Sequence, residues 1–145
     1  MKKSLLLAIV PLVILLSCDK DDKPPSNTQS KTEMLTTGTW KITAIASDND
    51  GNGSYETDVY LVFPACLKDN FYTFKVGGAL DMDESAVKCD PSDPQINTTS
   101  WLLSQNDTRL TLDGDQYVID QLNATTLKFK EPDATYGTMF TMIKR

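Results

Sequence analysis

The residues of this chain best suited to chemistry are oxygen ligands gathered in one short polar stretch. Asp48, Asp50 and Asn52 alternate, Gly53 follows, and Glu56 stands three residues after the glycine. Alternating carboxylate and amide oxygens around a glycine match the first half of a calcium loop, although the bidentate glutamate that should end such a loop is missing. The pattern predicts a weak calcium site, with a dissociation constant on the order of 10⁻⁴ to 10⁻³ M. A plain Asx/Gly turn is the alternative interpretation.

A second group of carboxylates, Asp81, Asp83 and Glu84, offers acid–base chemistry. In a strand the two aspartates share one face and Glu84 lies on the other. Such pairs divide the roles of acid and base in glycoside hydrolysis, but an exposed acidic strand end is the simpler interpretation. The 145 residues contain no histidine, which removes Ser-His and Cys-His arrangements and the usual zinc sites. We therefore expect a protein that is not an enzyme and that holds no cofactor other than the possible calcium.

Two cysteines, Cys66 and Cys89, stand apart from a third at position 18. No C-x-x-C motif accompanies them, so a redox or metal role is the less favoured alternative. If the chain is exported to an oxidising compartment, the two are expected to form a disulfide.

The first 17 residues predict that export. Met1 to Lys3 form a basic start, and 5–16 form an apolar segment too short to span a bilayer. The segment ends in Leu15-Leu16-Ser17-Cys18, which resembles the lipobox of bacterial lipoproteins. The resemblance implies cleavage before Cys18 and lipidation of its sulfur. Several acyl chains on one residue suffice for stable anchoring, so the membrane is an expected partner.

Residues 18–30 are polar and rich in turn formers, which predicts a flexible linker. Their charged run at 19–23 resembles the export signal of Bacteroidetes lipoproteins and implies an outer-membrane protein facing the cell surface. A merely solvated linker is the alternative. Cleavage would remove Lys2 and Lys3 and change the formal net charge from −6 to −8. Nucleic acid is therefore an unsuitable partner.

Residues 31–145 have the length of one domain. A helical turn is expected at 31–36, and a half-buried strand begins at Trp40, which should close the bottom of the core. Strict alternation in this strand places Ile42, Ala44 and Ala46 with Trp40 on one face and Ile45 on the other. Residues 55–68 are ambiguous, and we favour a strand-like start with a turn at the end.

Further strands follow at the spacing typical of barrels and sandwiches. Gly77-Gly78 predicts a hairpin between two strands, and turn residues separate the later ones. The expected strands after the first are 71–76, 79–83, 99–104, 109–112, 116–122, 126–130 and 138–144. Eight antiparallel strands are enough to close a barrel, with an open sandwich as the alternative. The predicted class is all-β.

Several of these segments together resemble the lipocalin-like lipoproteins of Bacteroidetes. The resemblance rests on the lipobox, Gly38-Thr39-Trp40, Cys66 with 68–74, Cys89, Trp101-Leu102-Leu103 and the closing 140–144. It implies an eight-stranded up-and-down barrel with a disulfide near the second and third strands. The chain departs from true lipocalins in stopping at Arg145, where a long helix normally packs on the barrel.

A barrel of this kind predicts binding of a small apolar or amphiphilic ligand inside it. The apolar residues expected to line its cavity are Trp40, Phe74, Trp101, Leu103, Leu112, Phe129 and Phe140. The alternative is a surface interaction module with a filled barrel, which would contact a protein or glycan partner through its loops.

Overall fold

The computed structural model describes residues 29–132 and 135–145. The lipobox, Cys18 and most of the predicted linker lie outside the described residues. Among the residues described, no helix is long and apolar enough to cross a membrane.

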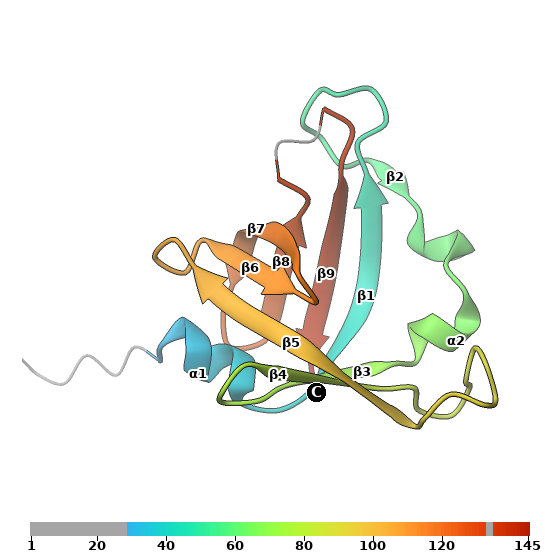
Figure 1. Cartoon of the computed structure of the whole chain (residues 1–145). Helices are drawn as coiled ribbons and strands as arrows, with labels where there is room; N and C mark the ends of the chain where they lie inside the picture. Colours follow the sequence, from blue (N-terminus) through green and yellow to red (C-terminus); the bar gives the residue numbers. More distant parts are fainter. Residues whose placement is uncertain (1–28, 133–134) are drawn as a thin grey trace, which may run out of the picture.

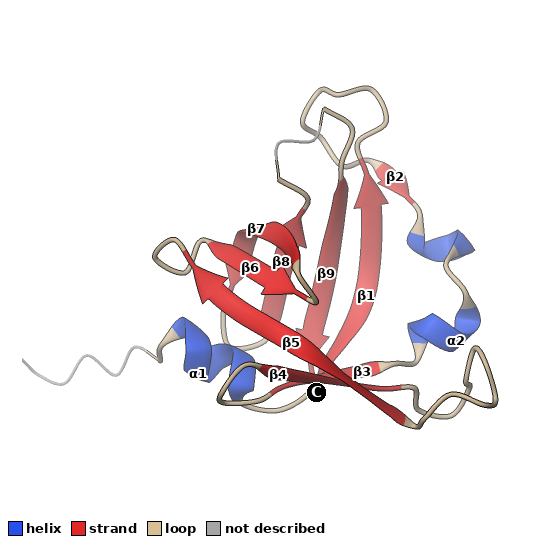
Figure 2. Ribbon diagram, in the orientation of Figure 1, coloured by secondary structure: helices blue, strands red, loops and turns tan. Residues whose placement is uncertain are grey.

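The described chain forms one antiparallel sheet that closes on itself (Figures 1 and 2). Its strands follow one another in space as they do in sequence, and β1 also pairs with β9. In chain order the elements are α1 (Lys31–Thr36), β1 (Trp40–Ser47), β2 (Thr57–Asp58), η1 (Tyr60–Val62), α2 (Ala65–Lys68), β3 (Phe71–Phe74), β4 (Ala79–Asp83), β5 (Ile96–Ser104), β6 (Arg109–Leu112), β7 (Asp115–Leu122), β8 (Thr126–Lys130) and β9 (Thr138–Lys144). The two-residue β2 flanks β1, and the other eight strands make the barrel.

The predicted barrel and its eight principal strands are confirmed. The region that was ambiguous in the sequence, 55–68, starts with β2 and ends in the short helices η1 and α2.

The inward face of β1 differs from the prediction. The register with β9 shifts between Ile42 and Ala44, so Thr43 is the extra residue of a β-bulge. The bulge inverts the alternation that follows it. Ile45 is therefore buried at 3% exposure, and Ala44 faces solvent. The expected inward position of Ala44 is wrong for this reason.

One end of the barrel is closed by α1. Ser30 caps this helix by accepting a hydrogen bond from the Glu33 N–H (3.1 Å). Leu35 is fully buried, and its carbonyl accepts from the indole N–H of Trp40 (2.9 Å). Lys144 donates to the carbonyl of Met34 (2.6 Å) and lies over the Trp40 ring. Trp40 thus closes the bottom of the core, as predicted.

The wall between β1 and β3 is the least regular part of the barrel. The two strands share a single pair, Trp40 with Tyr72. Farther along β1 its edge is covered by the segment 57–70: the Val59 N–H donates to the Ile45 carbonyl (3.0 Å) and the Tyr60 hydroxyl donates to the Ile42 carbonyl (3.1 Å). Side chains and isolated hydrogen bonds replace a continuous ladder along this seam.

A disulfide joins Cys66 of α2 to Cys89 in the β4–β5 connection, as predicted. Asp69, directly after α2, adds two hydrogen bonds, because its Oδ2 accepts from the N–H groups of Ala86 and Val87 (3.1 Å each). The connection between β4 and β5 is therefore fastened to the segment that covers the seam.

Candidate functional site

A cavity of about 520 Å³ lies inside the barrel. Four of the seven predicted lining residues belong to it: Phe74, Leu112, Phe129 and Phe140. Ile42, Leu80 and Met142 add aliphatic surface. A volume of this size is in the range of small-molecule sites.

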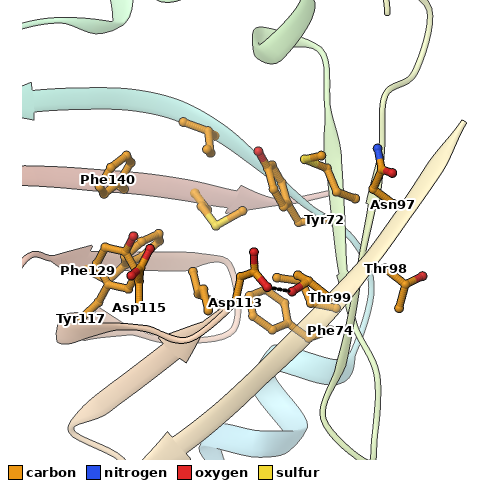
Figure 3. Close-up of a pocket in the computed structure, with 15 residues that line it drawn as sticks. Tyr72, Phe74, Asn97, Thr98, Thr99, Asp113, Asp115, Tyr117, Phe129 and Phe140 are labelled. Carbon is orange, nitrogen blue, oxygen red and sulfur yellow. Dashed lines mark hydrogen bonds between the residues drawn. The ribbon is translucent and has the colours of Figure 1, made fainter. Parts of the chain in front are cut away.

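One wall of the cavity is aromatic (Figure 3). The rings of Phe129 and Phe140 stack with centroids 5.2 Å apart, and Tyr117 meets Phe129 edge-on at 5.1 Å. Tyr117 belongs to β7, Phe129 to β8 and Phe140 to β9. Phe129 and Phe140 are direct partners in the pairing of β8 with β9, so their rings lie side by side. Such ring pairs hold a rigid, flat apolar surface in place.

Polar groups border the same cavity at the β6–β7 turn and along β5. Asp113 and Gly114 both have positive φ, as the two-residue type I′ turn requires. The turn brings Asp113 against β5, where the Thr99 hydroxyl donates to its Oδ1 (Figure 3). Asp115 is exposed and also borders the cavity. The cavity therefore reaches solvent beside two carboxylates.

Two tyrosines complete the polar part of the lining. Burial raises the pKa of Tyr117, and the nearby charges of Asp115 and Glu131 raise it further. Burial also raises the pKa of Tyr72. Both phenols are therefore neutral at pH 7, where they can donate or accept hydrogen bonds. Their neutrality gives the cavity polar contacts without adding charge.

Three predicted lining residues lie elsewhere. Trp40 is fully buried in the core that closes the barrel, beside Leu35. Trp101 is also core: its ring meets Phe74 edge-on at 5.4 Å, and its indole N–H donates to the Lys75 carbonyl (3.0 Å). Leu103 packs against the same core. None of the three lines the cavity, because they pack in or against the hydrophobic core near α1.

The predicted calcium ligands are arranged as a turn. Asp48 is buried, with Oδ1 accepting from the Gly51 N–H (2.7 Å) and Oδ2 from the Gly53 N–H (2.8 Å). Asp50 in turn accepts from the backbone and side chain of Asn52, and Glu56 is exposed. Across residues 29–132 and 135–145, no three His, Cys, Asp or Glu side chains come together to hold a metal ion. The loop has the hydrogen bonds of the Asx/Gly turn, with both carboxylate oxygens of Asp48 accepting backbone N–H groups.

The paired carboxylates of β4 are also engaged. Asp81 forms an ion pair with Lys75 and accepts from Thr98, and Asp83 accepts from Gln95 and from the Ser85 N–H. Both point away from the cavity, since Leu80 and Met82 between and beside them line it. Glu84 is different, because it is buried at 6% exposure. Strict alternation after Leu80 and Met82 places Glu84 on the inward face, a signal that the sequence contains.

An antiparallel barrel with an apolar cavity and a polar border defines the class of small-molecule-binding barrels. Residues 36–129 match the family model of the lipocalin-like domain. The match covers more than half of the 145 residues, and the chain belongs to this family. A search of curated proteins finds no match. Membership of a lipocalin-like family supports small-ligand binding rather than catalysis.

Proposed function

We propose that this protein binds a small apolar or amphiphilic molecule in the barrel cavity. The observation that carries the proposal is the cavity itself, about 520 Å³ with an aromatic wall and a polar border. An apolar ligand of this size would remove the rings of Phe129 and Phe140 from water, which stabilises the complex in proportion to the area buried. The filled barrel of the interaction-module alternative has no support in this geometry.

An apolar fluorescent dye tests the proposal. N-phenyl-1-naphthylamine should bind the folded domain with about one-to-one stoichiometry and increased emission. Met82 lines the cavity, so Met82→Trp should fill part of it and weaken binding by about tenfold or more. Val76→Trp is the matched control, because Val76 is 83% exposed and the same ring is added outside the barrel.

Absence of dye binding by a cooperatively folded domain would contradict the proposal. The interaction module with a protein or glycan partner would then replace it. Native mass spectrometry of protein purified from its own cells offers a second route, because a co-purified ligand would appear as a mass shift that Met82→Trp removes.

We further propose that the barrel is a lipoprotein of the outer membrane that faces the cell surface. The support is the sequence Leu15-Leu16-Ser17-Cys18 and the charged run after it. The full chain should incorporate labelled palmitate and sediment with membranes, and Cys18→Ala should do neither. External protease should digest the barrel on intact cells if it faces outward. Equal palmitate labelling of wild type and Cys18→Ala would refute the anchor.

A further inference from the structure

Three aromatic rings in the wall of the cavity meet as a corner. The rings of Phe129 and Phe140 are nearly parallel, with 15° between their planes. Tyr117 stands almost perpendicular to both, at 79° to Phe129 and 85° to Phe140. All three residues line the cavity (Figure 3). Aromatic rings prefer offset-stacked or edge-to-face contacts, so a ligand ring placed in this corner can make one with the phenylalanines and the other with the tyrosine. The corner suits a planar ring better than a flexible chain.

A carboxylate stands beside this corner. Asp115 precedes Tyr117 by two residues along β7, so the two side chains lie on the same face of the strand, and both line the cavity. Burial raises the pKa of Tyr117, and the negative charge of Asp115 is near enough to raise it further. Asp115 is exposed, and within 29–132 and 135–145 its carboxylate has neither an ion-pair nor a hydrogen-bond partner. The Asp113 carboxylate, in contrast, accepts from the Thr99 hydroxyl.

The hydrogen-bonding character of this border favours a ligand that donates. An ionised carboxylate only accepts, whereas the neutral Tyr117 hydroxyl can donate or accept. A ligand hydroxyl can therefore donate to Asp115, which gives a charge-assisted hydrogen bond. A ligand carboxylate would be repelled by Asp113 and Asp115, and the described lining contains no lysine or arginine that could pair with it.

An uncharged donor suits the border better than an ammonium group. Because Asp115 is exposed, salt screens its charge and water competes for its oxygens, so an ion pair there contributes little. An ammonium group would also lose hydration when the attached ring enters the apolar cavity. A hydroxyl makes the same hydrogen bond at a smaller desolvation cost.

We propose that the cavity selects hydroxylated aromatic compounds, with the ring in the corner of Tyr117, Phe129 and Phe140 and the hydroxyl donating to Asp115. This selectivity rests on the proposed small-molecule function and names the class of ligand. Aromatic carboxylates and aliphatic alcohols are poorer ligands for the same site, because the former lack the donor and the latter lack the ring.

Four probes test the two parts of this selectivity by equilibrium dialysis at pH 7.0. They are 2-naphthol, naphthalene, 2-naphthoate and octan-1-ol. We expect 2-naphthol to bind about fivefold more tightly than naphthalene, the effect of a charge-assisted hydrogen bond at an exposed site. It should also bind about fivefold more tightly than octan-1-ol, the effect of one aromatic pair. The weakest ligand should be 2-naphthoate, and raising the salt concentration should narrow its disadvantage.

Asp115→Ala removes the acceptor, so it should lower the affinity for 2-naphthol to that for naphthalene and leave the affinity for naphthalene unchanged. It should also improve binding of 2-naphthoate, because a repelling charge is lost. Asp120→Ala is the matched control: it removes the same charge from the same strand at an exposed position outside the cavity lining. This control should keep the preference for 2-naphthol. Phe140→Leu keeps an apolar side chain and removes a ring, so it should reduce the advantage of 2-naphthol over octan-1-ol.

The results distinguish this selectivity from the proposed function. If 2-naphthoate or octan-1-ol binds as tightly as 2-naphthol, or if Asp115→Ala keeps the advantage of 2-naphthol over naphthalene, the proposed ligand class is wrong while ligand binding stands. If neither the dye nor any of the four probes binds, the proposed function itself fails. The wild-type series requires no substitution, so the ligand class is decided even if a variant does not fold.

Discussion

Single aspartate side chains hold several turns of this protein by accepting backbone hydrogen bonds, and Asp48 is the clearest case. Its two carboxylate oxygens accept the N–H groups of Gly51 and Gly53. Burial opposes the charge, but these backbone hydrogen bonds outweigh it and lower the pKa of Asp48 below its usual value. The residue therefore acts as the anchor of a turn.

We expect Asp48→Ala to lower the melting temperature, because two loop amides lose their acceptor. Asp50→Ala should have a smaller effect, since Asp50 is exposed and bonds only within the turn. Calcium at 10 mM should leave the wild-type melting curve unchanged, because an ion raises stability only if the folded state binds it. A rise with calcium that magnesium does not produce, and that Asp48→Ala abolishes, would restore the metal site.

Stability should also decrease in acid. The ion pair with Lys75 and the hydrogen bond from Thr98 lower the pKa of Asp81, and hydrogen bonds from Gln95 and Ser85 lower that of Asp83. The unfolded chain thus binds protons more readily than the folded one, so the free energy of unfolding falls as pH drops below about 4. Urea titrations from pH 6 to pH 2.5 measure this. Asp83→Asn should show a shallower decrease than the wild type.

At the residue scale, sequence reasoning found the residues with a local signature and missed those defined by burial. The alternation of Asp48, Asp50 and Asn52 predicted a polar loop. The same spacing occurs in metal-binding loops and in Asx turns, so the sequence did not distinguish the two. The alternation of Glu84 with Leu80 and Met82 is a local signal for an inward position, but nothing local marks Asn70 or shows that both side chains are buried. Their burial depends on the pairing of β3 with β4, which neither segment specifies alone.

Among the elements, β1 shows how one extra residue alters a whole face. The bulge at Thr43 turns Ile45 inward. Ile45→Ala should therefore destabilise the domain by about 3 kcal/mol, the usual cost of removing a buried aliphatic side chain. Thr43→Ala, at an exposed position, should change stability by less than about 0.5 kcal/mol. Urea unfolding of both variants measures the difference; similar values for the two would contradict the bulged register.

The disulfide joins α2 to the connection between β4 and β5. Closing a loop between residues 23 positions apart restricts the unfolded chain and contributes about 3 kcal/mol. The double variant Cys66→Ser, Cys89→Ser should lose about this much stability, and reductant should have the same effect on the wild type. A thiol titration of unreduced, unfolded protein provides the control, since it should detect no free thiol in the domain from 31 to 145.

Element boundaries were predictable where turn chemistry is explicit. Asp113-Gly114 fixes the turn between β6 and β7, and Ser30 with Glu33 marks the start of α1. The bulge at Thr43 was not predictable, because no glycine or polar run announces it, and the register with β9 that imposes it is a long-range property. The irregular stretch 55–68 stayed ambiguous for the related reason that its hydrogen bonds to β1, from Val59 and Tyr60, join segments distant in the sequence.

For the whole molecule, the spacing of turns in the sequence predicted the number and order of the strands. It did not predict which inward residues line the cavity. Trp40, Phe74 and Trp101 are all large inward residues, yet only Phe74 lines the cavity. The difference is the position along the barrel axis: α1 covers the end that contains Trp40, whereas the polar residues that border the cavity lie along β5 and at the β6–β7 turn. The position of a residue along the barrel axis depends on the stagger of all the strands together. No single segment of the sequence specifies that stagger.

The seam between β1 and β3 is the part of the barrel wall that we expect to open most readily, because a single residue pair joins the two strands. Opening it breaks a few hydrogen bonds, such as those from Val59 and Tyr60, while the β1–β9 ladder stays intact. We expect backbone amides in 57–70 to exchange hydrogen faster than those of β9, and bound ligand to slow them. Since the Cys66–Cys89 bridge fastens one end of the segment, reduction should accelerate both amide exchange and dye dissociation. The residence time of a ligand would then depend on the redox state of the surroundings.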